Sequence, residues 1–233
     1  LYGLALAGLS RIHRVASPGV VLATALDFLW VIGSVALPTI RHVPNAEIVF
    51  AQAAVVLVFV ELQLLGIRRS IFVNGIGGFA LERVVQGSID RAWNVVSDVA
   101  RYAEVADTLH SSQIVSGEGL GMVRECEDDS GACWLETCTR WEPGRAYAFD
   151  VDTTAPRYPL PLKAMRGDFE VEALDASRTL VRIRFSFTPR GGLMTEHLLA
   201  LVFAMRGDAV VGGILRRWAR LIEAPAKTNV QVT

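Results

Sequence analysis

Two charged residues in the second half of the chain, Arg124 and Glu136, have the spacing of partners across a β-hairpin. The segment Asp129-Ser130-Gly131 between them suits a three-residue hairpin loop, with its glycine in the left-handed position of a bulge. In that register the two charges face each other on the concave, apolar side of a sheet. They then serve either as the polar anchor for a ligand head group or as a structural ion pair.

A second hairpin follows, because residues 142–145 place proline and glycine at the second and third positions of a type II turn. A two-residue loop there predicts three cross-strand pairs: Arg140 with Tyr147, Cys138 with Phe149, and Glu136 with Val151. Both hairpins together place one set of side chains on the apolar face: Trp134, Glu136, Cys138, Tyr147 and Phe149.

Further aromatic residues occur at alternate positions of the strands expected after these hairpins, so they point into the same interior. The predicted ligand-binding residues are Arg124, Trp134, Glu136, Cys138, Tyr147, Phe149, Phe169, Phe185, Phe187 and His197. The alternative for the aromatic members is ordinary core packing. A lone histidine such as His197 is more often a structural or exposed residue than a base. We therefore assign no catalytic residue.

Other chemistry-bearing patterns do not occur in the sequence. The three cysteines, Cys126, Cys133 and Cys138, lack the CxxC spacing of a zinc site and are too few for a disulfide scaffold. There is no Ser/His/Asp arrangement, glycine-rich phosphate loop or metal-ligand cluster. The formal net charge of −1 gives no basic surface for nucleic acid. We expect no metal, no cofactor and no nucleic-acid partner.

Period-two alternation of apolar and polar residues predicts the antiparallel strands that position these side chains. Strands are expected over residues 79–86, 145–152, 165–173 and 180–188. Ser88 is a suitable N-cap for a helix through residue 100, and a second short helix is expected at 102–106. A long helix then runs from residue 193 to about residue 224. Its predicted apolar stripe is Leu198, Val202, Met205, Ala209, Trp218, Leu221 and Ile222.

The N-terminal part of the chain is apolar, and the mean hydropathy of the whole chain is +0.36. Residues 20–40 and 47–67 are each about 20 residues long, enough to cross a bilayer as helices. The chain opens inside a further apolar run, so we expect a fragment whose true N-terminus is missing. Four arginines flank the spans on one side (Arg11, Arg14, Arg68 and Arg69) against Arg41 on the other. This predicts that everything after Arg69 is cytoplasmic.

Two carboxylates, Asp27 and Glu61, lie inside the predicted spans at similar depth. Carboxylates are costly in lipid, so they should face the helix bundle and find partners. One hypothesis is a shared polar site near Trp30 and Gln63. The favoured alternative is an interhelical hydrogen-bonded clasp that fixes helix packing.

Several segments carry a family resemblance: residues 88–99 (SIDRAWNVVSDV), 121–126 (GMVREC), 134–136 (WLE), 142–149 (EPGRAYAF) and 185–190 (FSFTPR). In their order and spacing they resemble the SRPBCC or START-like superfamily, in its polyketide cyclase/dehydrase and lipid-transport branch. The resemblance implies an α+β, helix-grip fold: an antiparallel sheet around a long C-terminal helix, with a ligand cavity between them. Here that domain follows transmembrane α-helices.

We therefore expect a transmembrane region at 1–70, a linker at 71–78, a START-like domain at 79–224 and a disordered tail at 225–233. The leading hypothesis is a multi-pass protein of the inner (cytoplasmic) membrane. Its cytoplasmic domain would bind, and on one version transfer, a hydrophobic small molecule or lipid. One alternative is a polyketide cyclase/dehydratase-like enzyme that uses a cavity carboxylate. Another is a regulatory membrane protein whose soluble domain binds a partner protein.

Overall fold

The computed structural model describes residues 18–41 and 44–225 of the 233-residue chain. The chain divides into two compact units. Unit 1 comprises the residues up to Gly77 together with Gly191–Gly207, and unit 2 comprises Gly78–Arg190 together with the residues from Asp208 onward. The apolar run at the start of the sequence lies outside the described residues, as does the predicted tail after residue 225.

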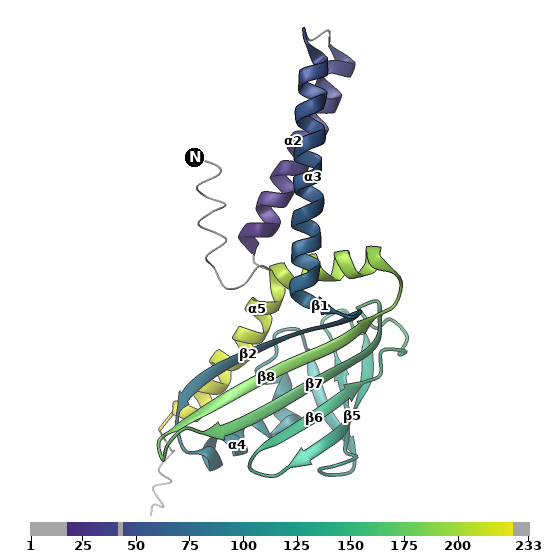
Figure 1. Ribbon diagram of the computed structural model, residues 1–233. Coiled ribbons are helices and arrows are strands. Elements are labelled where there is room, and N and C mark those ends of the chain that lie inside the picture. Colours follow the sequence, from purple (N-terminus) through teal and green to yellow (C-terminus); the bar gives the residue numbers. More distant parts are fainter. Residues whose placement is uncertain (1–17, 42–43, 226–233) are drawn as a thin grey trace, which may run out of the picture. The chain divides into compact units, whose positions relative to one another are not determined.

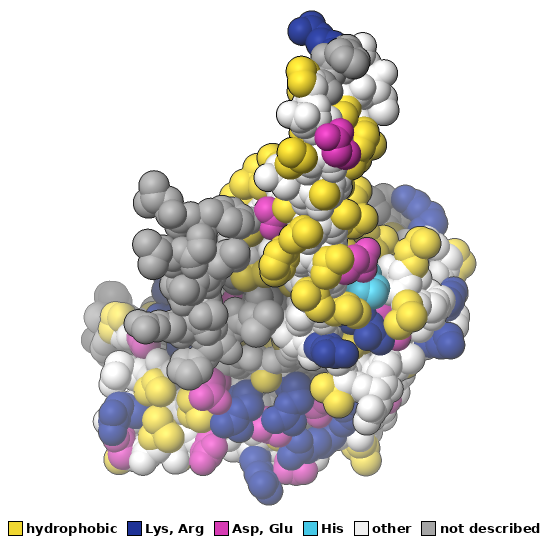
Figure 2. Space-filling model, turned by 45° about the horizontal axis from the view of Figure 1, so that its top comes forward, with side chains coloured by type: hydrophobic (Ala, Val, Ile, Leu, Met, Phe, Trp, Pro, Cys, Tyr) yellow, Lys and Arg dark blue, Asp and Glu magenta, His cyan; other side chains and the backbone are white. Residues whose placement is uncertain are grey.

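Unit 1 is built on two long helices, α2 (Pro18–Ile40) and α3 (Ala46–Ile71), where the sequence predicts membrane spans. Many of their large apolar side chains are exposed, and Figure 2 shows apolar side chains along the outer surface of this helical pair. Among the described residues, three helices are long and apolar enough to cross a membrane: α2, α3 and α5 (Leu193–Glu223). An exposed apolar surface of this kind is suited to lipid rather than water.

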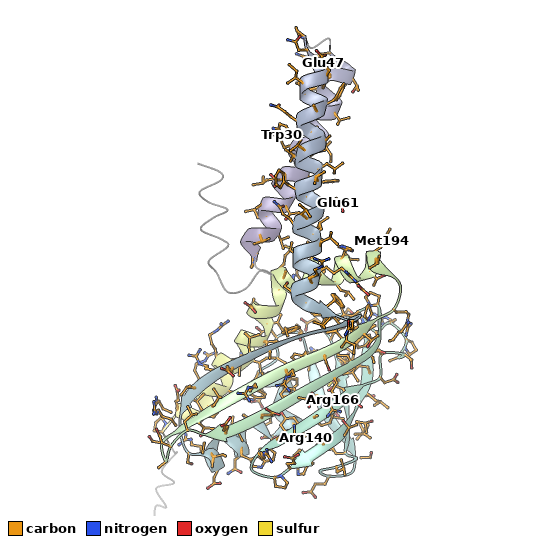
Figure 3. The ribbon with its side chains drawn as sticks, in the orientation of Figure 1. Trp30, Glu47, Glu61, Arg140, Arg166 and Met194 are labelled. Carbon is orange, nitrogen blue, oxygen red and sulfur yellow. The ribbon has the colours of Figure 1, made fainter. Side chains whose placement is uncertain are left out.

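A polar contact joins α2 to α3. The Gln63 Nε2 group donates a hydrogen bond to Asp27 Oδ2 at 2.9 Å. This is the interhelical clasp that the sequence favoured for Asp27. The sequence predicts that Glu61 also faces the helix bundle, but it lies exposed on α3, and Figure 3 shows its position along that helix.

The segment at 71–78, predicted as a linker, instead forms a tight hairpin. Strand β1 (Phe72–Val73) pairs with the start of β2 (Ile76–Gln86), with Phe72 opposite Gly77. Asn74 and Gly75 between them have φ values of 51° and 78°. Left-handed backbone at both central positions is the geometry that Asn-Gly favours in two-residue hairpins. The predicted linker at 71–78 is therefore wrong, because Asn74-Gly75 is a hairpin turn.

Unit 2 is an antiparallel sheet with short helices and the second half of α5 (Figure 1). Its strands lie in the order β2-β8-β7-β6-β5-β4-β3. After β2 come the α-helix α4 (Ile89–Val96) and the 3₁₀ helix η1 (Val99–Glu104). The remaining strands are β3 (Ser111–Ser116), β4 (Val123–Glu127), β5 (Cys133–Glu142), β6 (Ala146–Val151), β7 (Leu162–Ala173) and β8 (Arg178–Pro189).

Helix α4 begins where the sequence predicts. The Ser88 side chain accepts a hydrogen bond from the Arg91 backbone N–H, which satisfies one of the free donors of the first turn. The second short helix is confirmed as the 3₁₀ segment η1, which starts three residues earlier than expected. Together α4, η1 and the second half of α5 supply Val96, Tyr102 and Trp218 to the buried core of unit 2.

The register of the first hairpin is confirmed: Arg124 lies opposite Glu136, and Gly131 has a left-handed φ of 75°. The second hairpin confirms Cys138 opposite Phe149 and Glu136 opposite Val151. It corrects the third pair, because Arg140 lies opposite Ala148 rather than Tyr147. A β-bulge between Cys138 and Arg140 adds one residue to β5, and the loop is one residue longer than predicted, so the register below the bulge is unchanged.

Helix α5 shows a larger difference from its predicted apolar stripe. Trp218 and Ile222 are buried, as expected, but Leu198, Val202 and Met205 are exposed. The buried residues of the first half of α5 are Leu199 and the small Ala200, Ala204 and Gly207 instead. The larger apolar residues Leu198, Val202 and Met205 lie on the opposite, exposed face of the helix. The predicted stripe therefore combined the exposed face of the first half of α5 with the buried face of its second half.

The Tyr147 hydroxyl makes a buried hydrogen bond that ties β6 to α4, since it donates to the Val96 carbonyl at 2.7 Å. Replacing Tyr147→Phe keeps the ring but leaves that carbonyl without its partner. We expect a loss of about 1–3 kcal/mol in the free energy of unfolding, measured by urea unfolding of the full chain in mild detergent.

The matched control is Tyr158→Phe, because the Tyr158 hydroxyl donates its hydrogen bond to the weak acceptor Met165 Sδ, at 3.2 Å. This control should change stability by much less. Equal effects of the two substitutions would contradict the assigned role of the Tyr147 hydroxyl.

Candidate ligand-binding site

The centre of the candidate site is the ion pair between Arg124 on β4 and Glu136 on β5. Arg124 is 2% exposed and Glu136 is 8% exposed. The Nε and Nη2 groups of Arg124 donate to Glu136 Oε2 at 2.9 and 2.6 Å. The indole Nε1 of Trp134 donates to the other carboxylate oxygen, Oε1, at 2.9 Å. The carboxylate is therefore held by three hydrogen bonds, and its negative charge is balanced by the adjacent guanidinium.

Two aromatic rings cover the guanidinium of Arg124. Its Cζ atom lies 4.5 Å from the ring centroid of Tyr102 and 4.2 Å from that of Phe149. Both distances are within the range of cation–π attraction, which is stronger when the cation is removed from water. Tyr102 comes from η1, so the short helical segment after α4 closes this part of the interior.

One nitrogen of the Arg124 guanidinium, Nη1, takes no part in the ion pair. In the part of the chain that the structure describes, Arg124 Nη1 is buried and has no hydrogen-bond partner. A buried N–H group without an acceptor is destabilising by about 1–3 kcal/mol, and more when the group is charged. Such a group in an otherwise satisfied site marks the position where an acceptor atom of a ligand gains most from binding.

Burial controls the ionisation of the groups around the pair. Desolvation, the largest single influence, lowers the pKa of Arg124, but the charge of Glu136 together with smaller contributions from Cys126, Tyr102 and Tyr147 outweighs it, so the net shift is upward. Burial also raises the pKa of the Tyr102 and Tyr147 hydroxyls, which stay neutral. Burial, followed by the charge of Glu136, raises the pKa of the Cys126 thiol to about 12. The pair is thus the charged centre of a neutral, apolar surrounding.

The other predicted aromatic residues contact one another inside unit 2. The rings of Tyr147 and Phe169 stack with centroids 4.7 Å apart, and Phe169 lies edge-on to Trp218 at 5.9 Å. Phe187 is buried, and Phe185 is partly buried beside Phe79. Cys138 is buried, and its Sγ contacts the Arg140 carbonyl. For this group the core-packing alternative describes the contacts, and a ligand-lining role stays a prediction.

His197 belongs to a different part of the structure from the other predicted residues. It lies in the first turns of α5, within unit 1, and its Nδ1 atom is 2.7 Å from the Leu193 carbonyl oxygen. This contact with its own helix matches the structural interpretation of a lone histidine. Its assignment as a ligand-binding residue stays a prediction.

Sequence reasoning missed two residues that surround the pair. Tyr102 covers Arg124, and Tyr158, in the loop between β6 and β7, lies edge-on to Trp134 with ring centroids 5.4 Å apart. Neither residue lies in an alternating strand, so the period-two pattern gave no signal for them. The one available signal was the position of Tyr102 in the short helix expected directly after α4.

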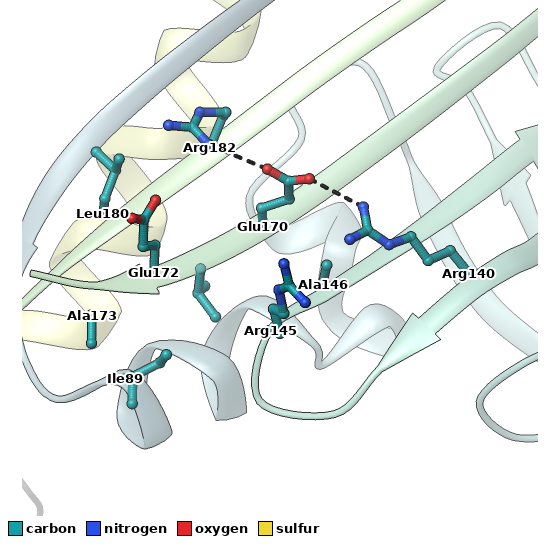
Figure 4. Close-up of a pocket in the computed structure, with 10 residues that line it drawn as sticks. Ile89, Arg140, Arg145, Ala146, Glu170, Glu172, Ala173, Leu180 and Arg182 are labelled. Atoms are coloured by element: carbon teal, nitrogen blue, oxygen red, sulfur yellow. Dashed lines mark hydrogen bonds and ion pairs between the residues drawn. The ribbon is translucent and has the colours of Figure 1, made fainter.

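A hollow away from the ion pair is lined by Glu170, which follows the buried Phe169 along β7 and so points to the opposite face of the sheet. Figure 4 shows Glu170 between Arg140 and Arg182, which donate to its two oxygens at 3.1 and 3.3 Å. Each of these charges already has an opposite charge beside it, and all three side chains are partly exposed. Partly exposed ion pairs contribute little to stability or binding. This hollow therefore provides no free polar group comparable to Arg124 Nη1.

In the described residues, no group of three or more His, Cys, Asp or Glu side chains is placed to hold a metal ion.

The curved antiparallel sheet, the long C-terminal helix and the buried polar pair define a START-like, helix-grip domain. Two of the solved structures that match this chain illustrate the shared fold. The aromatase/cyclase Zhui of Streptomyces sp. R1128 has a TM-score of 0.50 at 23% identity, covering 64% of this chain and 97% of that one. The protein XoxI of Bacillus cereus has a TM-score of 0.50 at 16% identity, covering 62% and 94%.

The sequence itself is more specific than these likenesses. Residues 78–223, more than half of the chain, match the family described as polyketide cyclase/dehydrase and lipid transport. The chain belongs to that family. A comparison with curated protein sequences gives no match.

The burial of the site predicts how its cysteines react. Desolvation and nearby carboxylates also raise the pKa of the Cys133 thiol, but Cys133 is exposed, so at about pH 8 a maleimide should modify it well before the buried Cys126 and Cys138, which should react only after unfolding. Mass spectrometry of the intact chain should show one fast adduct, and Cys133→Ser should remove it. Fast modification of Cys126 in the folded chain would contradict the closed interior around the ion pair.

Proposed function

We propose that this protein binds a hydrophobic small molecule or lipid in its START-like domain, and that α2 and α3 anchor the domain to a membrane. The single observation that carries the binding proposal is the buried, unpartnered Nη1 of Arg124. An apolar interior with few polar groups fixes the orientation of a ligand through those groups. Membership of a family described as polyketide cyclase/dehydrase and lipid transport supports the same ligand class.

The polar pair limits the chemistry of the ligand. Glu136 already balances the charge of Arg124, and the vacant position is a hydrogen-bond donor. A neutral acceptor oxygen, such as a carbonyl, ester or hydroxyl group, satisfies that donor without adding a buried charge. A ligand anion would bring a second negative charge close to Glu136 and lose its own hydration. We therefore propose a largely apolar ligand with a neutral oxygen at one end.

Membrane anchoring is supported by the exposed apolar surface of α2 and α3 and by their length. The arginine distribution favours the cytoplasmic side for the part of the chain after Arg69. On this basis we propose a multi-pass protein of the inner membrane with its START-like domain in the cytoplasm. A site held near the bilayer meets hydrophobic ligands at a raised local concentration, which favours binding and transfer.

The rival function is an enzyme of the cyclase/dehydratase type that uses Glu136 as acid or base. The family description and the fold shared with the aromatase/cyclase Zhui support this candidate. Against it, Glu136 accepts three hydrogen bonds from Arg124 and Trp134, which leaves about one of its four lone-pair positions for a substrate proton. We rank binding first for that reason.

The first experiment is native mass spectrometry of the full chain purified in mild detergent. We expect a bound hydrophobic molecule, and we expect its occupancy to fall about tenfold in the double variant Arg124→Met/Glu136→Leu, from the loss of a hydrogen bond worth about 1.4 kcal/mol. Removing both charges together avoids an uncompensated buried ion, so this variant should remain folded.

The matched control is Arg140→Met, which removes an arginine from the outer face of the same sheet and should leave occupancy unchanged. Unchanged occupancy in the folded double variant would overturn the anchoring role of Arg124. For the rival function, Glu136→Gln should leave a carrier able to bind the identified molecule. In an enzyme it should abolish conversion of that molecule.

A further inference from the structure

The first half of α5 exposes a continuous apolar stripe within unit 1. Met194 is 86% exposed, Leu198 57%, Val202 37% and Met205 55%. Their spacing of three and four residues places them on one face of the helix. Figure 3 shows Met194 at the start of α5 with its side chain directed outward. A soluble helix normally turns such a stripe toward the core, so this surface needs an apolar environment.

The same face changes character farther along the helix. At about 100° per residue, the stripe continues through Ala209 and Gly212 to Arg216, Arg220 and Glu223, all three of them exposed. The face is therefore apolar where α5 belongs to unit 1, the unit with α2 and α3, and charged where α5 belongs to unit 2. Such a change along one face indicates two different surroundings for the two halves of the helix.

An ion pair holds the start of this stripe beside the C-terminal end of α3. The Nε group of Arg68, in the last turn of α3, donates to Glu196 Oε2 at 2.6 Å. The Glu196 carboxylate also lies beside Gly75 in the β1–β2 turn, whose flanking residues Val73 and Ile76 are exposed. The start of α5 thus lies next to the end of α3, where a spanning helix leaves the hydrocarbon and enters the headgroup region.

We propose that the first half of α5 lies in the membrane interface, with its stripe of Met194, Leu198, Val202 and Met205 in contact with lipid. The partner is the bilayer that holds α2 and α3, so this inference rests on the proposed membrane anchoring. The exposed Arg69 at the same level favours anionic headgroups, since the charge of Arg68 is already balanced by Glu196. A helix with one apolar face typically enters such an interface to a depth of about 5–10 Å.

The length of this segment argues against a third span. The part of α5 in unit 1, Leu193–Gly207, has 15 residues. At 1.5 Å per residue it extends about 22 Å, which is short of the roughly 30 Å of a hydrocarbon core. Its second half packs Ile214, Trp218 and Ile222 into the core of unit 2 and is not available to a bilayer.

The test places a tryptophan on the stripe of the full chain. The background variant Trp30→Phe removes the one tryptophan within α2 and α3. Leu198→Trp is then reconstituted in vesicles of phosphatidylcholine and phosphatidylglycerol that contain brominated lipid as a quencher. The matched control is Arg220→Trp, which lies on the same face about 33 Å farther along the helix. We expect quenching at position 198 at least about twofold stronger than at position 220, and stronger with bromine near the headgroup than near the chain end.

The other possible results distinguish a failure of the interfacial position of α5 from a failure of membrane anchoring by α2 and α3. Stronger quenching by bromine near the chain ends would overturn the interfacial position in favour of a deeper one. No quenching at position 198, in a chain that still floats with the vesicles, would overturn this inference and leave membrane anchoring intact. A detergent-solubilised dimer that Leu198→Glu dissociates would then assign the stripe to a second copy of the chain. A chain that does not float at all would overturn the anchoring itself.

Discussion

The organisation of unit 2 depends on burying one guanidinium–carboxylate pair in an apolar interior. Removing both charges from water costs several kcal/mol per ion unless geometry and further hydrogen bonds compensate. Here two N–H groups of Arg124 and the indole of Trp134 hold the Glu136 carboxylate, and two aromatic rings cover the guanidinium. That arrangement requires β4 and β5 in one register, since a shift by one residue would place the two charges on opposite faces of the sheet. The pair therefore specifies the hairpin at least as much as it stabilises it.

Local turn chemistry made most of this fold predictable from sequence. Gly131 and Gly144 both have the left-handed backbone that the two hairpins required, and Ser88 caps α4 as expected. The bulge near Thr139 was not predictable, because a one-residue bulge and a one-residue longer loop cancel in the register of every pair below them. The β1–β2 turn was predicted wrongly for a different reason. Asn and Gly are common both in linkers and in hairpin turns, and the sequence does not show which segments pair on either side of Asn74 and Gly75.

The candidate site was predictable only where strands supply it. The turn residues of two hairpins identified Arg124, Trp134 and Glu136, because a hairpin loop fixes which side chains of the flanking strands share the buried face. Tyr102 and Tyr158 come from a 3₁₀ segment and a loop, where no period connects sequence to direction. The unpartnered Nη1 of Arg124 is also beyond sequence reasoning, since it depends on which of five donors the surrounding groups leave unused.

Helix α5 connects these observations, because the error in its predicted stripe has a physical cause. Its buried face runs from Ala200 and Ala204 to Leu215, Trp218 and Ile222, so apart from the buried Leu199 beside this face the side chains are small in the first half and large in the second. A pattern weighted by hydrophobicity follows the larger residues and so changes faces between the halves. In a wholly water-soluble domain, selection for solubility would place charges opposite the small residues, as Arg216 and Arg220 are placed in the second half. Leu198 and Met205 occupy those outward positions instead, which is the composition expected of a helix that has lipid on one side.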